Sequence, residues 1–431
     1  MASHRIAHID LGRRRVEIED LDPGLIRTWA GGSGLASWRL YQEVGPETDP
    51  LGHGNVVYIT GGPLTGTVAP CSGRVEVVTK SALTGLLGLS NSGGMFGARL
   101  RQGGLDGLVL RGVSEEPVYL FVRQDQVEFR DARRLWGRDT WETAESIGRE
   151  LNDPSLQRVK VMAIGPAGEN LVRFACLINE HCHAAGRGGA GAVLGAKKVK
   201  AIAVDSKGSS LPVSSAFRDA ASRAAEKIRK NTACQNYSRF GALPGSDTSA
   251  EIGCLPGKNY QTGVLEGWHE TRGTAKAKSY VARPRGSCFR CAMPCFNEVE
   301  VPGADGEGFK ITSGTFVQVI LDFGAKCGVD SLPGIWRAKE MCHRLGMDQG
   351  AASGSASFAM ELFQRGILTL KDTRGLAMTW GDEKALLRLL DEIAHRRGLG
   401  KVLGEGTLRA SKVIGGDSSR YLTFASLCRR Y

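Results

Sequence analysis

Several features that would point to other classes of protein are missing from this sequence. It has no apolar run approaching the roughly 20 residues of a membrane helix, so we expect no membrane association. The N-terminus, MASHRIAHIDLGRRRVEIED, has no apolar core of the kind found in export signals. There is no basic tail, nucleic-acid motif, internal repeat or low-complexity segment. We therefore expect a cytoplasmic protein that binds no nucleic acid.

The composition is that of a globular chain. Its 431 residues suit two or three domains, and 23% charged with 42% hydrophobic residues is ordinary. The net charge of +11 fits a solvated basic surface, an anionic cofactor or an acidic protein partner. Without an export signal, the 11 cysteines suggest free thiols and metal ligands rather than disulfides.

The secondary-structure patterns change along the chain. The first half predicts β-strands at NVVYIT, RVEVVT, DGLVLRG, PVYLFV, QVEFRD, RVKVMAIG and VKAIAVD, with a helix at DTWETAESIGRELN. After the serine-rich stretch SKGSSLPVSS, helices are predicted at SAFRDAASRAAEKIRKN, with Ser215 as N-cap, and at LPGIWRAKEMCHRLG, SASFAMELFQRGIL and DEKALLRLLDEIAHRRG. The predicted fold is α+β, with a β-rich domain over residues 1–208 and a mainly α-helical domain over 209–431.

Glycine-rich loops in the first half carry polar residues suited to an anionic cofactor. Glycine lets the backbone approach a ligand closely, and arginine makes bidentate contacts with phosphate. None of the loops follows the G-x-G-x-x-G dinucleotide pattern. For each loop, a tight turn or close backbone packing is the alternative. The candidate cofactor-binding residues are Arg74, Asn91, Ser92, Gly93, Gly94, Arg187, Gly188 and Gly189.

A group of cysteines in GSCFRCAMPCFN has metal-ligand spacing. Cys288, Cys291 and Cys295 follow a C-x2-C-x3-C pattern. Iron-sulfur clusters and structural zinc normally take four protein ligands, so one ligand is unaccounted for. Zinc and uncoordinated thiols remain alternatives to an iron-sulfur cluster. Arg285 and Arg290 would offset the negative charge of a thiolate-ligated cluster.

Two long segments carry a family resemblance. SGRVEVVTKSALTGLLGLSNSGGMFGARLRQGGLDGLVLRG and IGPAGENLVRFACLINEHCHAAGRGGAGAVLGAKKVKAIAV resemble the tungsten-containing aldehyde:ferredoxin oxidoreductases. The resemblance implies a first domain of two packed β-sheets that cradles two pyranopterin dithiolenes holding tungsten or molybdenum, and it is compatible with Mg²⁺. It also implies a pterin motif at CHRLGMDQ, where Gly346 and Asp348 are kept and His343 replaces an aspartate.

The resemblance assigns the cysteine motif to a [4Fe–4S] cluster. It places the fourth cysteine in a third domain, which we expect to be absent, so the fourth ligand is expected outside this chain or poorly placed. Cys428, in ASLCRRY, is a further candidate for that ligand. Six other cysteines are expected to be small buried hydrophobes, namely Cys71, Cys176, Cys182, Cys234, Cys254 and Cys342.

The acid–base pair that the resemblance implies, a glutamate and a histidine, is replaced in this sequence by residues of other types. The resemblance places its glutamate at Phe316 or Gln318 and its histidine at Phe424. Cys327 and His343 are the candidate catalytic residues that remain, with Glu340 and Asp322 as nearby titratable groups. Cys327 could also be a packed structural cysteine, and the Glu340/His343 pair is expected on the surface.

The resemblance predicts a tungstopterin, iron-sulfur oxidoreductase. It would oxidise an aldehyde and water to a carboxylate and pass electrons to ferredoxin or a similar acidic carrier. The replaced acid–base residues favour an incomplete or divergent enzyme. A non-catalytic cofactor-binding or electron-transfer subunit of a split enzyme, or a truncated remnant, is the alternative. We also expect self-association, or a partner subunit that supplies the missing domain.

Overall fold

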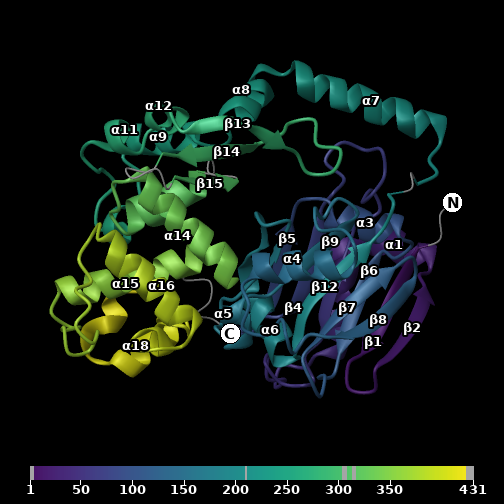
Figure 1. Cartoon of the computed structure of the whole chain (residues 1–431), viewed down its shortest axis with the longest axis horizontal. Helices are drawn as coiled ribbons and strands as arrows, with labels where there is room; N and C mark the ends of the chain where they lie inside the picture. Colours follow the sequence, from purple (N-terminus) through teal and green to yellow (C-terminus); the bar gives the residue numbers. More distant parts are fainter. Residues whose placement is uncertain (1–3, 209–210, 303–307, 313–316, 424–431) are drawn as a thin grey trace. The chain divides into compact units, whose positions relative to one another are not determined.

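The structure is a computed structural model that describes residues 4–208, 211–302, 308–312 and 317–423 (Figure 1). Its residues fall into two compact units. The first comprises Met1–Arg229, Cys288–Ala292 and Arg344–Asp348, and the second Lys230–Ser287, Met293–His343 and Gln349–Tyr431. The helix over Ser215–Lys230 therefore belongs almost entirely to the first unit. The predicted sequence boundary at residue 208 stays a prediction.

The first unit contains a six-stranded sheet near its N-terminus, in the order β2-β1-β6-β3-β4-β5. The sequence patterns predict three of these six strands, at NVVYIT, RVEVVT and DGLVLRG. Helix α2 (Gly32–Glu43) covers one face, and Leu35 packs there with Tyr58, Val78 and Val109. The strands are β1 (Arg5–Asp10), β2 (Arg15–Asp20), β3 (Val57–Thr60), β4 (Val75–Lys80), β5 (Leu87–Ser92) and β6 (Gly107–Arg111).

A second six-stranded sheet in the same unit has the order β11-β10-β9-β12-β7-β8. Helix α4 (Thr140–Glu150) begins at an Asp139/Glu142 capping box and places Ile147 against Tyr119 and Val159. The strands are β7 (Val118–Arg123), β8 (Gln126–Asp131), β9 (Val159–Ala163), β10 (Leu177–Asn179), β11 (His183–Ala185) and β12 (Val199–Asp205).

Two short helices lie between the sheets. Helix α3 (Phe96–Gln102) contacts β4 of the first sheet and β9 and β12 of the second. Helix α6 (Ala190–Ala196), sequence AGAVLGA, contacts β3 and β4 as well as β12. Glycine and alanine let both sheets approach these helices closely. The predicted pair of sheets is confirmed, with helices packed between them.

The remaining helices of the first unit differ in exposure, and Pro166, Ala167 and Gly168 of one of them are buried. Helix α7 is largely exposed, and the Ser214 hydroxyl accepts a hydrogen bond from the Phe217 amide at 3.2 Å. The cap is therefore provided by Ser214 rather than by the predicted Ser215, which is the first helical residue. These helices are α1 (Pro23–Trp29), α5 (Pro166–Glu169), the 3-10 turn η1 (Arg187–Gly189) and α7 (Ser215–Lys230).

The second unit is mainly helical, as predicted. Its core includes Phe323, Trp336, Phe358 and Leu389, each no more than 1% exposed. Its helices are α8 (Thr232–Phe240), α9 (Pro244–Glu251), α10 (Gly257–Tyr260), α11 (Trp268–Thr271), α12 (Thr274–Lys278), α13 (Val317–Val319), α14 (Leu332–Leu345), α15 (Gln349–Gln364), α16 (Glu383–Ala394), α17 (Gly400–Leu403), α18 (Thr407–Ile414) and the 3-10 segment η3 (Gly416–Tyr421).

This unit also has two features that the sequence patterns did not predict. A three-stranded antiparallel sheet is formed by β13 (Val281–Gly286), β14 (Phe296–Val301) and β15 (Phe309–Thr312). A π-helical segment, η2 (Ile320–Lys326), follows α13. In the part of the chain that the structure describes, no helix combines the length and apolar character needed to cross a bilayer.

A buried lysine in the first unit is a costly feature of the fold. Lys197 is 1% exposed, and its ammonium group donates to the Gly112 carbonyl at 2.9 Å. Burial lowers the pKa of Lys197 from 10.5 to about 8. Below pH 8 the lysine is charged in both the folded and the unfolded chain, and the folded chain bears the full free-energy cost of burying that charge. Between pH 8 and 10.5 only the unfolded chain keeps the proton, so this cost declines and stability rises with pH.

We predict that Lys197→Met raises the free energy of unfolding at pH 7 by about 1–3 kcal/mol, because a buried charge is removed at the cost of one hydrogen bond. The gain should shrink as pH rises from 8 to 10.5. Urea titrations at pH 7 and pH 10 measure both effects. Lys198→Met, at a partly buried neighbouring position, is the control and should change stability by less than about 0.5 kcal/mol. Equal stability of Lys197→Met and the unaltered protein at both pH values would contradict this account.

Candidate functional site

The start of β4 and the end of β5 bring together two of the predicted cofactor-binding residues. In this antiparallel pair Glu76 lies opposite Asn91. The Arg74 guanidinium donates to the Asn91 side-chain oxygen at 2.6 Å, and the Asn91 amide donates to the Glu76 carboxylate. Arg74 and Asn91 are exposed. β5 is the edge strand, so these polar groups form an open rim.

The third predicted loop joins the same rim. The Arg187 amide, in η1, donates to the Ser90 hydroxyl of β5 at 3.0 Å. The Arg187 guanidinium forms an ion pair with Asp348 at 3.2 Å, where the Asp348 carboxylate is buried. Strand pairing of Ala175 with Met347 holds this segment in place. The predicted residues from four separate segments therefore meet around β5.

The segment that carries the first two motif cysteines packs against this rim. The Phe289 amide donates to the Gly94 carbonyl at 3.1 Å. A Cβ atom at Gly93 would lie 2.8 Å from the Cys288 sulfur, and one at Gly73 would lie 2.8 Å from the Phe289 Cβ. Contacts this short leave no room for any side chain larger than hydrogen. Glycine is therefore required where the cysteine segment meets the glycine-rich loops.

Other glycines of the predicted loops serve packing. A Cβ at Gly188 would lie 3.1 Å from the Gly88 Cα, and one at Gly189 would overlap the Arg173 carbonyl oxygen. Both glycines have positive φ angles, +78° and +73°. Close backbone packing, the alternative considered for these loops, therefore explains these two positions without a ligand.

Sequence reasoning missed a glutamate and a histidine beside the same loop. The Glu180 carboxylate accepts from the Met95 amide at 2.7 Å and lies 3.7 Å from the Lys160 ammonium. Burial raises the pKa of Glu180. His183 lies 4.0 Å from the Glu180 carboxylate, and a Cβ at Gly93 would lie 3.2 Å from its Nδ1. The polar run NEHCH, from the end of β10 to the start of β11, was the available signal.

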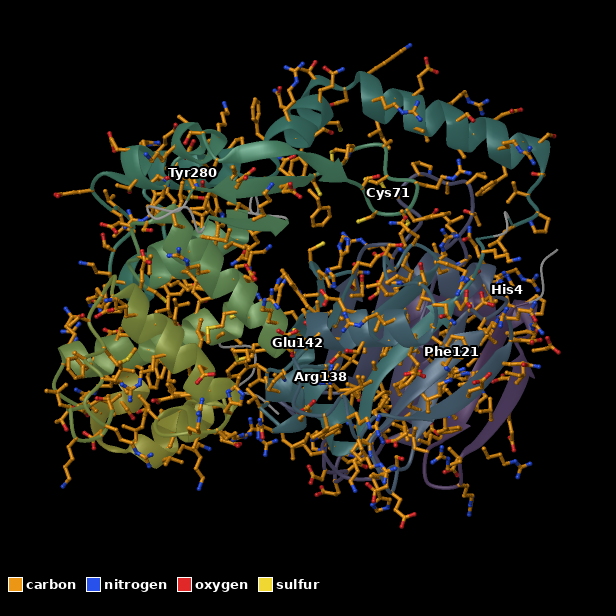
Figure 2. The ribbon with its side chains drawn as sticks, in the orientation of Figure 1. His4, Cys71, Phe121, Arg138, Glu142 and Tyr280 are labelled. Atoms are coloured by element: carbon orange, nitrogen blue, oxygen red, sulfur yellow. The ribbon has the colours of Figure 1, made fainter. Side chains whose placement is uncertain are left out.

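The two units divide the cysteine motif between them. Cys288 and Cys291 belong to the first unit and Cys295 to the second. The Cys71 sulfur lies 3.7 Å from the Cys291 sulfur, on the loop that leads into β4 (Figure 2). Among the described side chains, no three His, Cys, Asp or Glu groups are gathered closely enough to hold one metal ion.

The burial predicted for the remaining cysteines is partly wrong. Cys176 and Cys342 are buried as predicted. Cys71 and Cys254 are exposed, while Cys182 and Cys234 are intermediate. Cys71 lies on an open loop rather than in the core. Cys428 lies outside the described residues.

The two candidate catalytic residues are both buried, Cys327 directly after η2 and His343 on α14. Cys327 is fully buried, and its thiol donates to the Ser353 carbonyl at 3.6 Å. Burial raises the pKa of Cys327 well above its usual range, which favours a neutral packed thiol over a thiolate ligand. His343, on α14, is 6% exposed, so the expectation of a surface pair with Glu340 is wrong for the histidine.

One of the positions that the resemblance gives to a catalytic glutamate can be described. The Gln318 amide donates to the Asp322 carboxylate at 3.1 Å. Asp322 lies in η2, is fully buried, and forms an ion pair with Lys326 at 2.6 Å. A buried carboxylate therefore lies next to Gln318. Phe316 and Phe424 lie outside the described residues.

Comparison with known proteins identifies the family. A family model described as "Aldehyde ferredoxin oxidoreductase, N-terminal domain" matches residues 6–206, and one described as "domains 2 & 3" of the same protein matches residues 219–424. The chain belongs to the aldehyde ferredoxin oxidoreductase family.

Among curated relatives, the "Tungsten-containing aldehyde ferredoxin oxidoreductase" of Thermococcus kodakarensis is 38% identical over 415 residues, covering 95% of this chain and 67% of the relative. The protein of that name from Pyrococcus furiosus is 37% identical over 414 residues, with the same coverage. The "Aliphatic sulfonate oxidoreductase, WOR-like subunit" of the same organism is 30% identical over 445 residues, covering 97% of this chain and 69% of the relative.

A solved structure is similar along most of the chain. It is titled "Active site complex BamBC of Benzoyl Coenzyme A reductase in complex with 1,5 Dienoyl-CoA". The TM-score is 0.81 at 28% identity, covering 97% of this chain and 64% of that one. The chain thus spans about two thirds of the length of its relatives. These similarities favour a family enzyme over the alternatives of a non-catalytic subunit or a truncated remnant.

The packing around the Gly93–Gly94 turn can be tested by substitution. We predict that Gly94→Ala lowers the free energy of unfolding by about 2–4 kcal/mol, because φ is +89° and the new methyl group would overlap the Glu180 carboxylate. Thermal unfolding of the two proteins measures the loss. Gly85→Ala is the matched control, because φ is +74° and no atom lies within 4 Å of the added Cβ. The control should lose only about 1 kcal/mol, and equal losses for the two variants would argue against the packing account.

Proposed function

We propose that this chain oxidises an aldehyde with water to a carboxylate and transfers the electrons to a ferredoxin-type acceptor. The balanced reaction is RCHO + H₂O → RCOO⁻ + 3H⁺ + 2e⁻. The observation that carries the proposal is the hydrogen bond between Phe289 and Gly94. It joins a metal-ligand motif to a rim of exposed arginine and asparagine side chains. A site that needs both an organic cofactor and an electron outlet requires this arrangement.

The rim has the chemistry to hold a phosphate-bearing pterin. Arg74 and Arg187 are exposed and come from separate segments that meet at β5. Arginine makes charge-assisted, bidentate contacts with phosphate oxygens. Asp348 orients the Arg187 guanidinium, and Asn91 orients that of Arg74. These residues fit a tungstopterin or its molybdenum counterpart, which would supply the two-electron oxidation when bound.

The cysteine motif fits a cluster that accepts those electrons. Cys288, Cys291 and Cys295 would supply three thiolates to a [4Fe–4S] cluster. Arg290 carries a positive charge beside Cys291, which offsets the charge of the thiolates. The net charge of +11 suits an acidic partner such as ferredoxin, because complementary charge accelerates association. A cytoplasmic site of action and self-association stay predictions.

The proposal predicts a slow enzyme. Glutamine and phenylalanine side chains at positions 316, 318 and 424 cannot take up a proton at neutral pH, and acid–base groups typically contribute about 10²–10⁴ in rate. We expect protein produced anaerobically with tungstate to reduce a viologen dye with an aldehyde at a rate lower by about that factor than its relatives. Full turnover would show that another group, such as Asp322, takes the proton. Protein that binds neither tungsten nor iron would overturn the proposed function.

The rim can be tested separately from turnover. We predict that Arg74→Gln lowers the tungsten content of the purified protein at least several-fold. The substitution removes a cationic side chain that would donate hydrogen bonds to the phosphate of the cofactor. Elemental analysis measures the tungsten, and circular dichroism checks that the fold is retained. Arg133→Gln, which removes an exposed arginine after β8, is the control and should keep its full tungsten content. Equal tungsten in both variants would remove Arg74 from the site.

A further inference from the structure

A cavity of about 590 Å³ lies beside helix α7, and the residues of its wall belong to the first unit. Arg218, Ser222, Ala225 and Arg229 of the helix form part of this wall, and Arg290 forms another part. The proposed reaction gives no role to this helix. We propose that the cavity is a docking site for an extended acidic segment of a partner protein.

The four wall residues of α7 share one face of the helix. They are spaced 4, 3 and 4 positions apart, so at about 100° per residue they fall within about 60° of one another. Arg218 and Arg229 are 11 positions apart, which separates their Cα atoms by about 16 Å along the helix axis. Ser222 and Ala225, between them, have small side chains. The face is therefore a shallow track with an arginine at each end.

Arg218 and Arg290 bring positive charge to the cavity. Both are exposed, and in the part of the chain that the structure describes neither guanidinium forms an ion pair. By contrast, Arg39 of the same unit forms an ion pair with Glu19 at 2.6 Å. A ligand with carboxylate groups would supply the counter-charges that the cavity needs, because complementary charge favours association and selects the partner.

The backbone fixes the position from which Arg290 lines the cavity. Its φ is 53°, in the left-handed region that residues with a Cβ atom rarely adopt. The Cys71 amide, from the loop before β4, donates to the Arg290 carbonyl at 2.9 Å. Such backbone strain persists only where the surroundings impose it, and it concentrates at binding and catalytic sites. The cavity therefore has one arginine on a fixed turn, opposite the arginines of a helix.

Helix α7 itself packs weakly on its own unit. Among its 16 residues only Ala221 is buried. A helix in a folded protein gains most of its stability from the packing of one face, and much less from the propensity of its residues. A segment bound in the cavity would cover the face that carries Arg218 and Arg229, and would add the packing that the helix lacks.

The geometry favours a polypeptide over a small anion. A small-molecule site buries most of its ligand, whereas Arg218, Ser222 and Arg229 are exposed. A single phosphate group is too short to occupy both ends of a face about 16 Å long. An extended segment places every second side chain on one side, about 6.6 Å apart, so three acidic residues in alternation match this length. Val68 and Val213, also in the wall, offer apolar contacts to the residues between them.

Peptide binding tests the charges. A dansyl-labelled hexapeptide of alternating glutamate and alanine is titrated with the unaltered chain, Arg218→Gln and Arg290→Gln, and binding is followed by fluorescence anisotropy. Arg223→Gln is the matched control, because it removes the same charge from an exposed position about 140° around α7 from Arg218. We expect affinity to fall about fivefold or more in Arg218→Gln and Arg290→Gln, and less than about twofold in the control.

A pair of substitutions tests the shape of the cavity with every charge kept. Ala225→Trp fills the helix face between the two arginines, so we expect it to weaken peptide binding about fivefold. Ala224→Trp adds the same side chain at an exposed position about 100° away on the helix, and it should bind the peptide as the unaltered chain does. Circular dichroism checks that both variants keep their helical content. Equal binding by the two variants would overturn the cavity as the docking site.

Two further probes complete the test. A peptide with glutamine in place of glutamate should not bind, and equal binding of the two peptides would overturn the role of charge. Inorganic pyrophosphate that binds with the same dependence on Arg218, while the acidic peptide does not bind, would assign the cavity to a small anion and overturn the proposal. Equal losses in Arg218→Gln and Arg223→Gln would show attraction to net charge alone and would also overturn it. None of these measurements needs a metal or turnover, so their failure leaves the proposed function standing.

Discussion

The Phe289 amide reaches the Gly94 carbonyl because the glycines around it carry no side chain. A methyl group at Gly73 or Gly93 would meet Phe289 or the Cys288 sulfur, and the cysteine segment would be pushed off the sheet edge. That contact joins the cysteine segment to a rim that carries Arg74 and Arg187. Everything proposed for the site depends on it, because a cofactor and a cluster exchange electrons only when they are held close together.

The parts of the fold that the sequence predicted are those with local signals. The alternation in RVEVVT and the apolar spacing in DEKALLRLLDEIAHRRG are each read within one element, and both elements form as predicted. Strand β5 was not predicted, because its sequence, LGLSNS, is typical of a loop. Leu87 and Leu89 lie exposed on this edge strand. It pairs with β4 through long-range hydrogen bonds that no short window of sequence contains.

The candidate site likewise combines residues with a local sequence pattern and residues that only the folded chain brings together. The spacing of Cys288, Cys291 and Cys295 is a local pattern, so the motif was visible. Cys71 was expected in a core because an isolated cysteine usually packs there, and only the folded chain brings it to Cys291. Glu180 and His183 escaped for a related reason. Their position depends on the sheet pairing that places β10 and β11 beside the Gly93–Gly94 turn.

The division of the chain into units sets an order of events during synthesis. The first unit includes Cys288–Ala292 and Arg344–Asp348, which leave the ribosome long after Arg229. At about 5–20 residues per second, the intervening Lys230–Ser287 segment alone takes about 3–12 s to emerge. Both sheets can pair during that delay, while the edge at β5 and the loop at Cys71 still lack their partners. The nascent protein therefore passes through a stage in which its sheets are formed but the segment of Cys288 and Cys291 has not yet joined Cys71 and the Gly93–Gly94 turn.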